Sequence, residues 1–138
     1  MTLRTFLTSA AAAATFACAA SAETELQTAF SNGGTAMTAE EIADLVVGKA
    51  VTAKAGTKTF RFYYEPGNWL IGELEGGGWS GAGAYAITDG NQICVSMPKD
   101  GGRYRCLTVV RNSDTVRKYN AEGKATFEIL ATEKASGL

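Results

Sequence analysis

Residues 92–110 read QICVSMPKDGGRYRCLTVV, and this stretch decides the fold class. Two runs rich in β-branched and aromatic residues flank the cluster Pro98-Lys99-Asp100-Gly101-Gly102, which predicts a β-hairpin. A hairpin centred on Asp100 places Cys94 directly across from Cys106, close enough for a disulfide worth about 3 kcal/mol in the chain-entropy model. The spacing is not Cys-x-x-Cys and no helix begins beside it, so we expect a structural disulfide rather than a redox pair.

The two faces of this hairpin differ in chemistry, because side chains alternate between the faces of a strand. One face carries Gln92, Cys94, Ser96, Tyr104, Cys106 and Thr108, and the other carries Ile93, Val95, Met97, Arg103, Arg105, Leu107 and Val109. The second face is the predicted interior, yet it places Arg103 and Arg105 toward the turn. Near a barrel mouth, two arginines beside Met97 suit an anionic ligand. The alternative is that both side chains extend from the rim into solvent and bind nothing specific.

Short strand-like runs separated by Gly, Asp and Asn turns continue on both sides of the hairpin. The runs outside it are Ala50–Thr52, Thr59–Tyr64, Trp69–Leu74, Trp79–Thr88, Thr115–Tyr119 and Thr126–Ala131. With the two hairpin strands they make eight, with no helix among them, which is typical of an all-β antiparallel meander. Closing such a sheet removes its exposed edges, so the prediction is an eight-stranded up-and-down barrel, with a β-sandwich as the alternative.

One short helix precedes these strands. Thr38 is followed three residues later by Glu41, a capping-box pattern, and Ile42, Leu45 and Val46 recur at helical spacing up to Gly48. The helix over 38–47 is expected to lie across an open end or a face of the sheet. Residues 23–37 are largely polar and contain Asn32-Gly33-Gly34, so they are expected to form a flexible arm, with room for a short helical turn, before a single domain over 38–138.

The first 22 residues predict export. A single charge, Arg4, precedes an apolar stretch, and Ala20-Ser21-Ala22 supplies small residues for cleavage after Ala22. The stretch is short and rich in Ala, Ser and Thr, which disfavours a membrane anchor. A lipoprotein lipidated at Cys18 is the less favoured alternative, because Thr15 stands where an aliphatic residue is usual. We therefore expect a periplasmic or secreted protein without a membrane span.

The mature chain would have 116 residues, with 12 Lys and Arg against 14 Asp and Glu. This balance gives no electrostatic footprint for nucleic acid. The sequence contains no histidine, which excludes Ser-His-Asp triads and the usual histidine metal and haem sites, and pairing the two cysteines excludes a thiolate site. We expect no catalytic residue, no metal and no cofactor. Glu73 and Glu75 share one strand face and could do acid–base work or bind calcium, although a solvated strand end beside the Gly76–Gly78 turn is the favoured interpretation.

Basic and aromatic residues supply the other candidates for a binding site. Those that could line a cavity are Arg61, Tyr63, Tyr64, Trp69, Trp79 and Tyr85, and the ligand-binding residues predicted from all these patterns are Arg103, Arg105, Tyr63 and Trp79. An aromatic stripe on a strand also serves simply as core.

Several short motifs resemble those of a known family. They are Gly48-Lys49 after a helix, Phe60–Gly67, Gly78-Trp79, Asp89–Cys94, Arg105–Val109, Tyr119 and Glu122-Gly123-Lys124. The chain resembles a family of small exported proteobacterial proteins of unknown function, which have a Gly-x-Trp strand and a Cys…Cys hairpin. That resemblance implies an exported β-rich domain and no known catalytic residue. Ser80–Tyr85 is more weakly similar to a Ser-Gly-Ala-x-Tyr stretch of membrane-associated lysozyme inhibitors, from which this chain differs by an extra residue and by its cysteine positions.

Three functions follow as hypotheses. The first is a non-enzymatic barrel that binds a small ligand or another envelope component, and it requires a cavity faced by Arg103, Arg105 or the aromatic residues. The second is an inhibitor of a lysozyme or protease, which requires a filled core and protruding Gly-rich loops. The third is a carboxylate enzyme, which requires Glu73 or Glu75 in a cleft opposite another acid.

Overall fold

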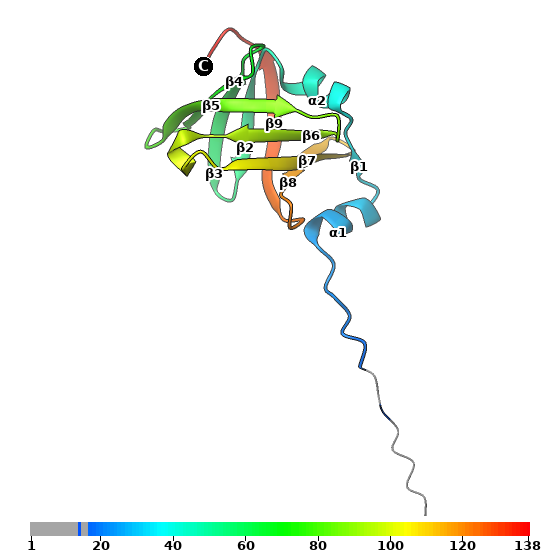
Figure 1. The fold of residues 1–138 in the computed structure, drawn as a ribbon. Coiled ribbons are helices and arrows are strands. Elements are labelled where there is room, and N and C mark those ends of the chain that lie inside the picture. The colour runs from blue at the N-terminus through cyan, green and yellow to red at the C-terminus, as the bar shows by residue number, and fades with distance from the viewer. Residues whose placement is uncertain (1–13, 15–16) are drawn as a thin grey trace, which may run out of the picture.

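The predicted strand runs form one antiparallel sheet that closes into a barrel (Figure 1). The computed structural model describes residue 14 and residues 17–138. Its elements are α1 (Glu25–Ser31), β1 (Thr35–Ala36), α2 (Ala39–Val46), β2 (Lys49–Ala55), β3 (Lys58–Tyr64), β4 (Trp69–Leu74), β5 (Ser80–Ile87), β6 (Gln92–Ser96), a 3₁₀ turn η1 (Pro98–Asp100), β7 (Tyr104–Asn112), β8 (Thr115–Tyr119) and β9 (Ala125–Lys134). Eight of these strands, β2–β9, make the barrel, and β1 is an additional short strand.

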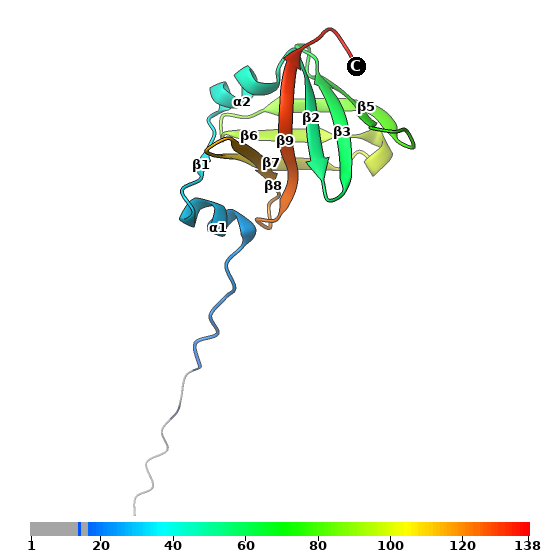
Figure 2. The same ribbon diagram turned by 180° about the vertical axis from the view of Figure 1, so that it is seen from behind.

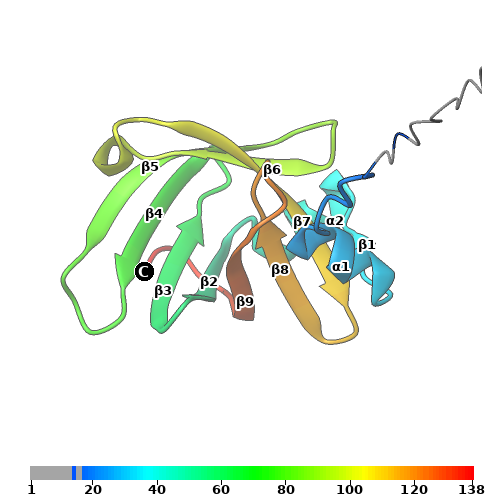
Figure 3. The ribbon, with the colours of Figure 1, turned by 90° about the horizontal axis from the view of Figure 1, so that it is seen from below.

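The strands follow one another around the barrel in chain order from β2 to β7. On the other side of β2 come β9 and then β8, and the pairing of β7 with β8 closes the ring (Figure 2). Figure 3 shows β5 and β6 along one side of the ring and β2, β3 and β9 along the other. Register shifts after Thr52 on β2 and after Lys118 on β8 bend the sheet where β9 passes between them, as bulges do.

The cysteine hairpin has the predicted register. Cys94 lies opposite Cys106 across β6 and β7, with Cα atoms 3.9 Å apart, and a disulfide joins them. The predicted inner face is confirmed at Ile93, Val95, Met97, Leu107 and Val109, which all belong to the buried core.

Aromatic rings fill the interior beside β3. Phe60 and Phe62 each make edge-to-face contacts with Trp79 and with Phe127, with ring centroids 5.6–6.5 Å apart. Close backbone approach explains one glycine in the small-residue strand β5, since a Cβ on Gly83 would lie 2.2 Å from the carbonyl oxygen of Ser96. Gly83 therefore allows β6 and the chain after it to lie tightly against β5.

The predicted helix is α2, and its capping box is complete. Thr38 accepts a hydrogen bond from the Glu41 amide, and the Glu41 carboxylate accepts one from the Thr38 amide. Ile42 and Val46 are buried in the core, so α2 lies with its apolar face against the barrel.

The segment over 23–37, expected to be a flexible arm, is instead folded onto the barrel. It contains a second helix, α1, with its own capping box between Thr24 and Gln27, and the strand β1, which pairs with the last part of β7. Long-range hydrogen bonds hold α1 in place, from the Leu26 amide to the Gly123 carbonyl and from the Ala125 amide to the Glu25 carboxylate. These partners are distant in sequence, so local composition did not reveal them.

The predicted export signal over 1–22 lies mostly outside the described residues. Cys18 is described, and it is exposed and not part of a disulfide. Within the described part of the chain, no helix has the length and apolar character needed to cross a bilayer.

Candidate functional site

The barrel wall is incomplete beside the first half of β7. Residues 104–108 pair with β6 on one side, whereas pairing with β8 on the other side begins only at Thr108. Residues 104–107 therefore have a free edge that faces the turn between β8 and β9. A strand edge without a partner leaves backbone donors and acceptors available for another molecule.

A cleft occupies this gap. It has a volume of about 680 Å³, and its walls include Gln92, Asp100, Arg103, Tyr104, Arg105, Cys106, Leu107, Asn120, Ala121, Glu122, Thr126 and Phe127. A smaller cavity of about 60 Å³ lies inside the barrel, lined by Phe62, Tyr64, Leu70, Trp79, Val95, Met97, Asp100, Arg105, Leu107, Lys118 and Phe127. The two share Asp100, Arg105, Leu107 and Phe127, so the inner cavity adjoins the cleft.

The inner cavity contains a buried lysine. Lys118 points from β8 into the barrel and is only 3% exposed, the one buried charged residue in the described part of the chain. Its ammonium group donates a hydrogen bond to the Tyr64 hydroxyl at 2.6 Å and lies 5.1 Å from the centre of that ring. Among the described residues no carboxylate lies within ion-pair distance of it.

Such a lysine is unusual, because a buried charge normally has a counter-ion. Here one neutral hydroxyl and one aromatic face provide its stabilisation. Further hydrogen-bond capacity remains, because an ammonium group has three donors.

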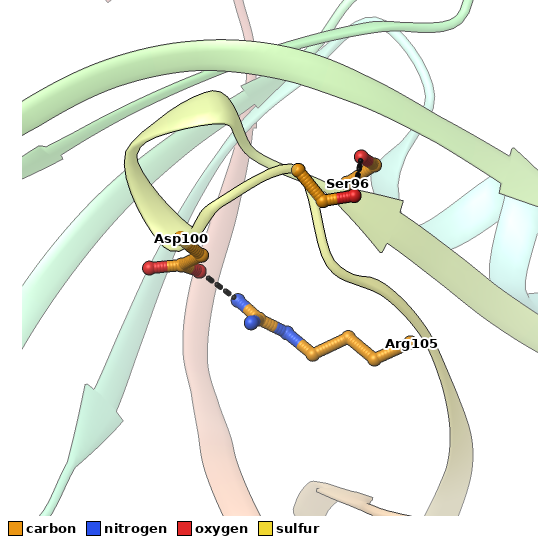
Figure 4. A network of polar contacts seen from close by, with 4 residues as sticks. Ser96, Asp100 and Arg105 are labelled. Atoms are coloured by element: carbon orange, nitrogen blue, oxygen red, sulfur yellow. Dashed lines mark hydrogen bonds and ion pairs between the residues drawn. The ribbon is translucent and has the colours of Figure 1, made fainter.

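Arg105 supplies a second cation where the cavity meets the cleft. Its guanidinium donates a 2.7 Å hydrogen bond to the Asp100 carboxylate, which comes from the η1 turn (Figure 4). The two side chains are 31% and 36% exposed, so this ion pair is accessible from the cleft. The inner cavity thus has two cations and one carboxylate in its walls, together with an otherwise apolar, aromatic lining.

Tyr64 connects this site to a second tyrosine. The Tyr85 ring meets the Tyr64 ring edge-on with centroids 5.1 Å apart, and the Tyr85 hydroxyl donates to the Glu65 carbonyl at 2.7 Å. Burial raises the pKa of Tyr85, with smaller contributions from Tyr64, Tyr63 and Glu65. Both hydroxyls are hydrogen-bonded, so the position of the Tyr64 ring beside Lys118 is well defined.

The structure brings together some of the predicted ligand-binding residues but not all of them. Arg105 and Trp79 line the inner cavity, whereas Arg103 is exposed and reaches only the outer cleft. Tyr63 does not line either space, because it alternates with the inward-facing Phe62 and Tyr64 and so lies on the outer face of β3. Trp69 is exposed and is likewise absent from both linings.

Lys118 was not among the predicted residues. Its signal in the sequence is weak: Val116 and Lys118 share a face of a strand whose other residues give no clear indication of which face is inside. A lysine at the end of a short strand is far more often solvated than buried.

Two further hollows lack a comparable buried charge. One, of about 490 Å³, lies under α1 against the outer face of β7 and β8. The other, of about 600 Å³, contains Glu73, Glu75 and the Gly76–Gly78 turn. Glu73 lies 3.8 Å from Arg61, which also contacts Glu133. No cluster of three or more acidic or cysteine side chains suited to a metal occurs in the part of the chain that the structure describes.

Comparison of the chain with family models, with curated proteins and with solved structures gave no match. The proposed function therefore rests on the geometry of the cavity and the cleft.

Proposed function

We propose that this protein is an exported, non-enzymatic binding module that receives the anionic end of a small ligand inside its barrel. Lys118 is the inner cation and Arg105 is the outer cation. The cleft beside the free edge of β7 is the route in and holds the rest of the ligand.

The observation that carries this proposal is the burial of Lys118 without a counter-ion. An enclosed lysine that contributed only to stability would be expected to pair with a carboxylate or to be replaced by an apolar residue. A ligand that brings a negative charge would complete this site, and a charge-assisted hydrogen bond in a water-poor cavity is among the stronger polar interactions.

The volumes limit which part of the ligand enters. The inner cavity, at about 60 Å³, is far smaller than the cleft, at about 680 Å³. We expect only a small end group of the ligand, such as a carboxylate, to enter the inner cavity. The body would lie in the cleft, against Leu107 and Phe127.

The two tryptophans offer a direct measurement. Trp79 lines the inner cavity and Trp69 is exposed, so Trp69→Phe leaves Trp79 as the sole tryptophan and places its fluorescence beside the site. Sodium octanoate, titrated below its micellar concentration, should give a saturable change in Trp79 emission. Octylamine and octanol, which have the same chain without the negative charge, should not.

Lys118→Met in that background tests the role of the cation. Losing a charge-assisted hydrogen bond should weaken octanoate binding by at least about tenfold. Lys134→Met is the matched control, because Lys134 is exposed on β9. Octanoate binding of equal strength in the wild type and in Lys118→Met, or equal binding of octylamine, would contradict the proposal.

One observation favours an inhibitor as a second candidate. The interior is largely filled with side chains, and Gly76, Gly77 and Gly78 form an exposed turn with positive φ angles. Such a turn could insert into the active site of a lysozyme or protease. Inhibition of either enzyme class by the mature protein, lost when the three glycines are replaced by Ala-Ser-Ala, would favour this function over ligand binding.

A further inference from the structure

The guanidinium of Arg105 already holds a carboxylate, and that carboxylate belongs to the protein itself. Asp100 is the only hydrogen-bond partner of the Arg105 side chain among the described residues, through one nitrogen and one oxygen. A guanidinium has five N–H donors and matches a carboxylate best through two parallel bonds. The contact with Asp100 therefore uses only part of what Arg105 offers.

The loop that carries Asp100 does not depend on this ion pair. Backbone hydrogen bonds from the amides of Asp100 and Gly102 to the Met97 carbonyl hold the turn at 2.9 and 3.0 Å, and the Gly101 amide donates to the Pro98 carbonyl at 2.9 Å. The Ser96 hydroxyl donates to the Gly102 carbonyl at 2.9 Å (Figure 4). The Asp100 carboxylate can leave Arg105 without unfolding the loop.

Asp100 also lies at the boundary that a ligand must cross. Both Asp100 and Arg105 line the inner cavity and the outer cleft. About a third of each side chain is exposed, so water can reach the pair and compete for it. An arriving anion would meet Arg105 with Asp100 already bound to it.

We infer that Asp100 is an internal substitute for the ligand, that the natural ligand carries a carboxylate, and that this carboxylate replaces Asp100 on Arg105. The inference rests on the proposed function and adds to it the chemical class of the ligand and an internal competitor. The class follows from the group now present, because the η1 turn places a planar carboxylate on Arg105.

Asp100→Asn tests the competition. The amide keeps the size of the side chain and removes its charge, so residue 100 holds the Arg105 guanidinium less strongly and competes less with the ligand. Octanoate should bind up to about fivefold more tightly than to the wild type, since an exposed ion pair is worth at most roughly 1 kcal/mol. Octyl phosphate, an anion of different shape, should bind more weakly than octanoate to both proteins. Trp79 fluorescence in the Trp69→Phe background is the readout.

Glu128→Gln is the matched control. It removes the carboxylate from another exposed ion pair, with Arg117 at 3.2 Å, whose residues do not line the cavity. Octanoate affinity should not change in this variant. A similar gain in both variants would show a general effect of net charge and would overturn the inference.

The remaining outcomes distinguish failure of the inference about Asp100 from failure of the proposed function. Unchanged or weaker octanoate binding in Asp100→Asn would overturn the competition, while the proposed function stands if Lys118→Met still loses binding. Tighter binding of octyl phosphate than of octanoate would overturn the carboxylate assignment alone. If neither the wild type nor Asp100→Asn binds any of these anions, the proposed function fails and the inference fails with it.

Discussion

The two halves of β7 have different neighbours and different roles. From Thr108 to Asn112 the strand pairs with β8 on one side, and β1 pairs with residues 110 and 111 on the other. From Tyr104 to Leu107 it pairs with β6 alone, and its other edge opens onto the cleft. The half with two neighbours closes the barrel, and the half with one neighbour carries Arg105.

A small barrel can therefore be closed by strand pairing and still have an opening in its wall. Closure needs only the five pairs between β7 and β8, so the rest of β7 is free to form a wall of the site. The open half lacks a second strand neighbour, and the Cys94–Cys106 disulfide lies within it. The cross-link stabilises the half that strand pairing supports least.

Removing the disulfide should lower the free energy of unfolding more than any other change along β7. For a loop of this length, Cys94→Ala with Cys106→Ala should lower the free energy of unfolding by about 3 kcal/mol, measured by urea denaturation. Octanoate binding should weaken as well, since Arg105 is next to Cys106. Ser96→Ala, which removes only the side-chain hydrogen bond to Gly102, should cost about 1 kcal/mol or less. Equal losses of unfolding free energy in the double cysteine variant and in Ser96→Ala would mean that the disulfide does not stabilise the open half of β7.

Truncating one residue in each half should separate stability from binding. Val109→Ala in the closed half removes two buried methyl groups and should cost about 2 kcal/mol in unfolding free energy. Arg105→Ala in the open half should cost less than about 1 kcal/mol, because its ion pair is partly exposed, yet it should abolish octanoate binding. Measuring both quantities for both variants tests whether the two roles are divided along β7.

A double-mutant cycle at Lys118 and Tyr64 should show a smaller effect. Lys118→Met leaves the buried Tyr64 hydroxyl without its partner, at a cost of about 1–2 kcal/mol. Adding Tyr64→Phe removes the unsatisfied hydroxyl and should recover most of that loss, since replacing a buried polar pair with apolar groups is often neutral. Additive losses in urea denaturation would show that the two groups are not coupled.

Local patterns were sufficient to predict the barrel strands. Alternation, turn residues and the cysteine spacing predicted eight strands and the hairpin register because each depends on residues close in sequence. α1 was anticipated only as a short helical turn within a flexible arm, although Thr24 and Gln27 provide a capping box, because none of its residues is buried. Its position depends on Gly123 and Ala125, about a hundred residues away.

The site was predictable only in part, for a related reason. Strand parity placed Arg105 on the inner face, and the turn placed it near an opening. Parity alone could not show that Arg103, just before β7 begins, would lie outside, or that β8 turns Lys118 inward. Which face of β8 is inside depends on its pairing with β7 and β9, which a single strand does not encode.

The smallest predicted effect concerns Tyr85, which contacts Tyr64 and lines neither the inner cavity nor the cleft. Its pKa is raised in the folded protein, so the folded state retains the phenolic proton more strongly than the unfolded chain does. The resulting stability is complete below about pH 10, the ordinary tyrosine pKa, and is lost as the pH rises through the folded-state value. The unfolding free energy of the wild type should therefore fall above pH 10, and that of Tyr85→Phe should fall less over the same range. Tyr104→Phe, which alters an exposed tyrosine, should follow the wild type. Parallel curves for all three proteins would show that burial of Tyr85 contributes nothing to the alkaline limit.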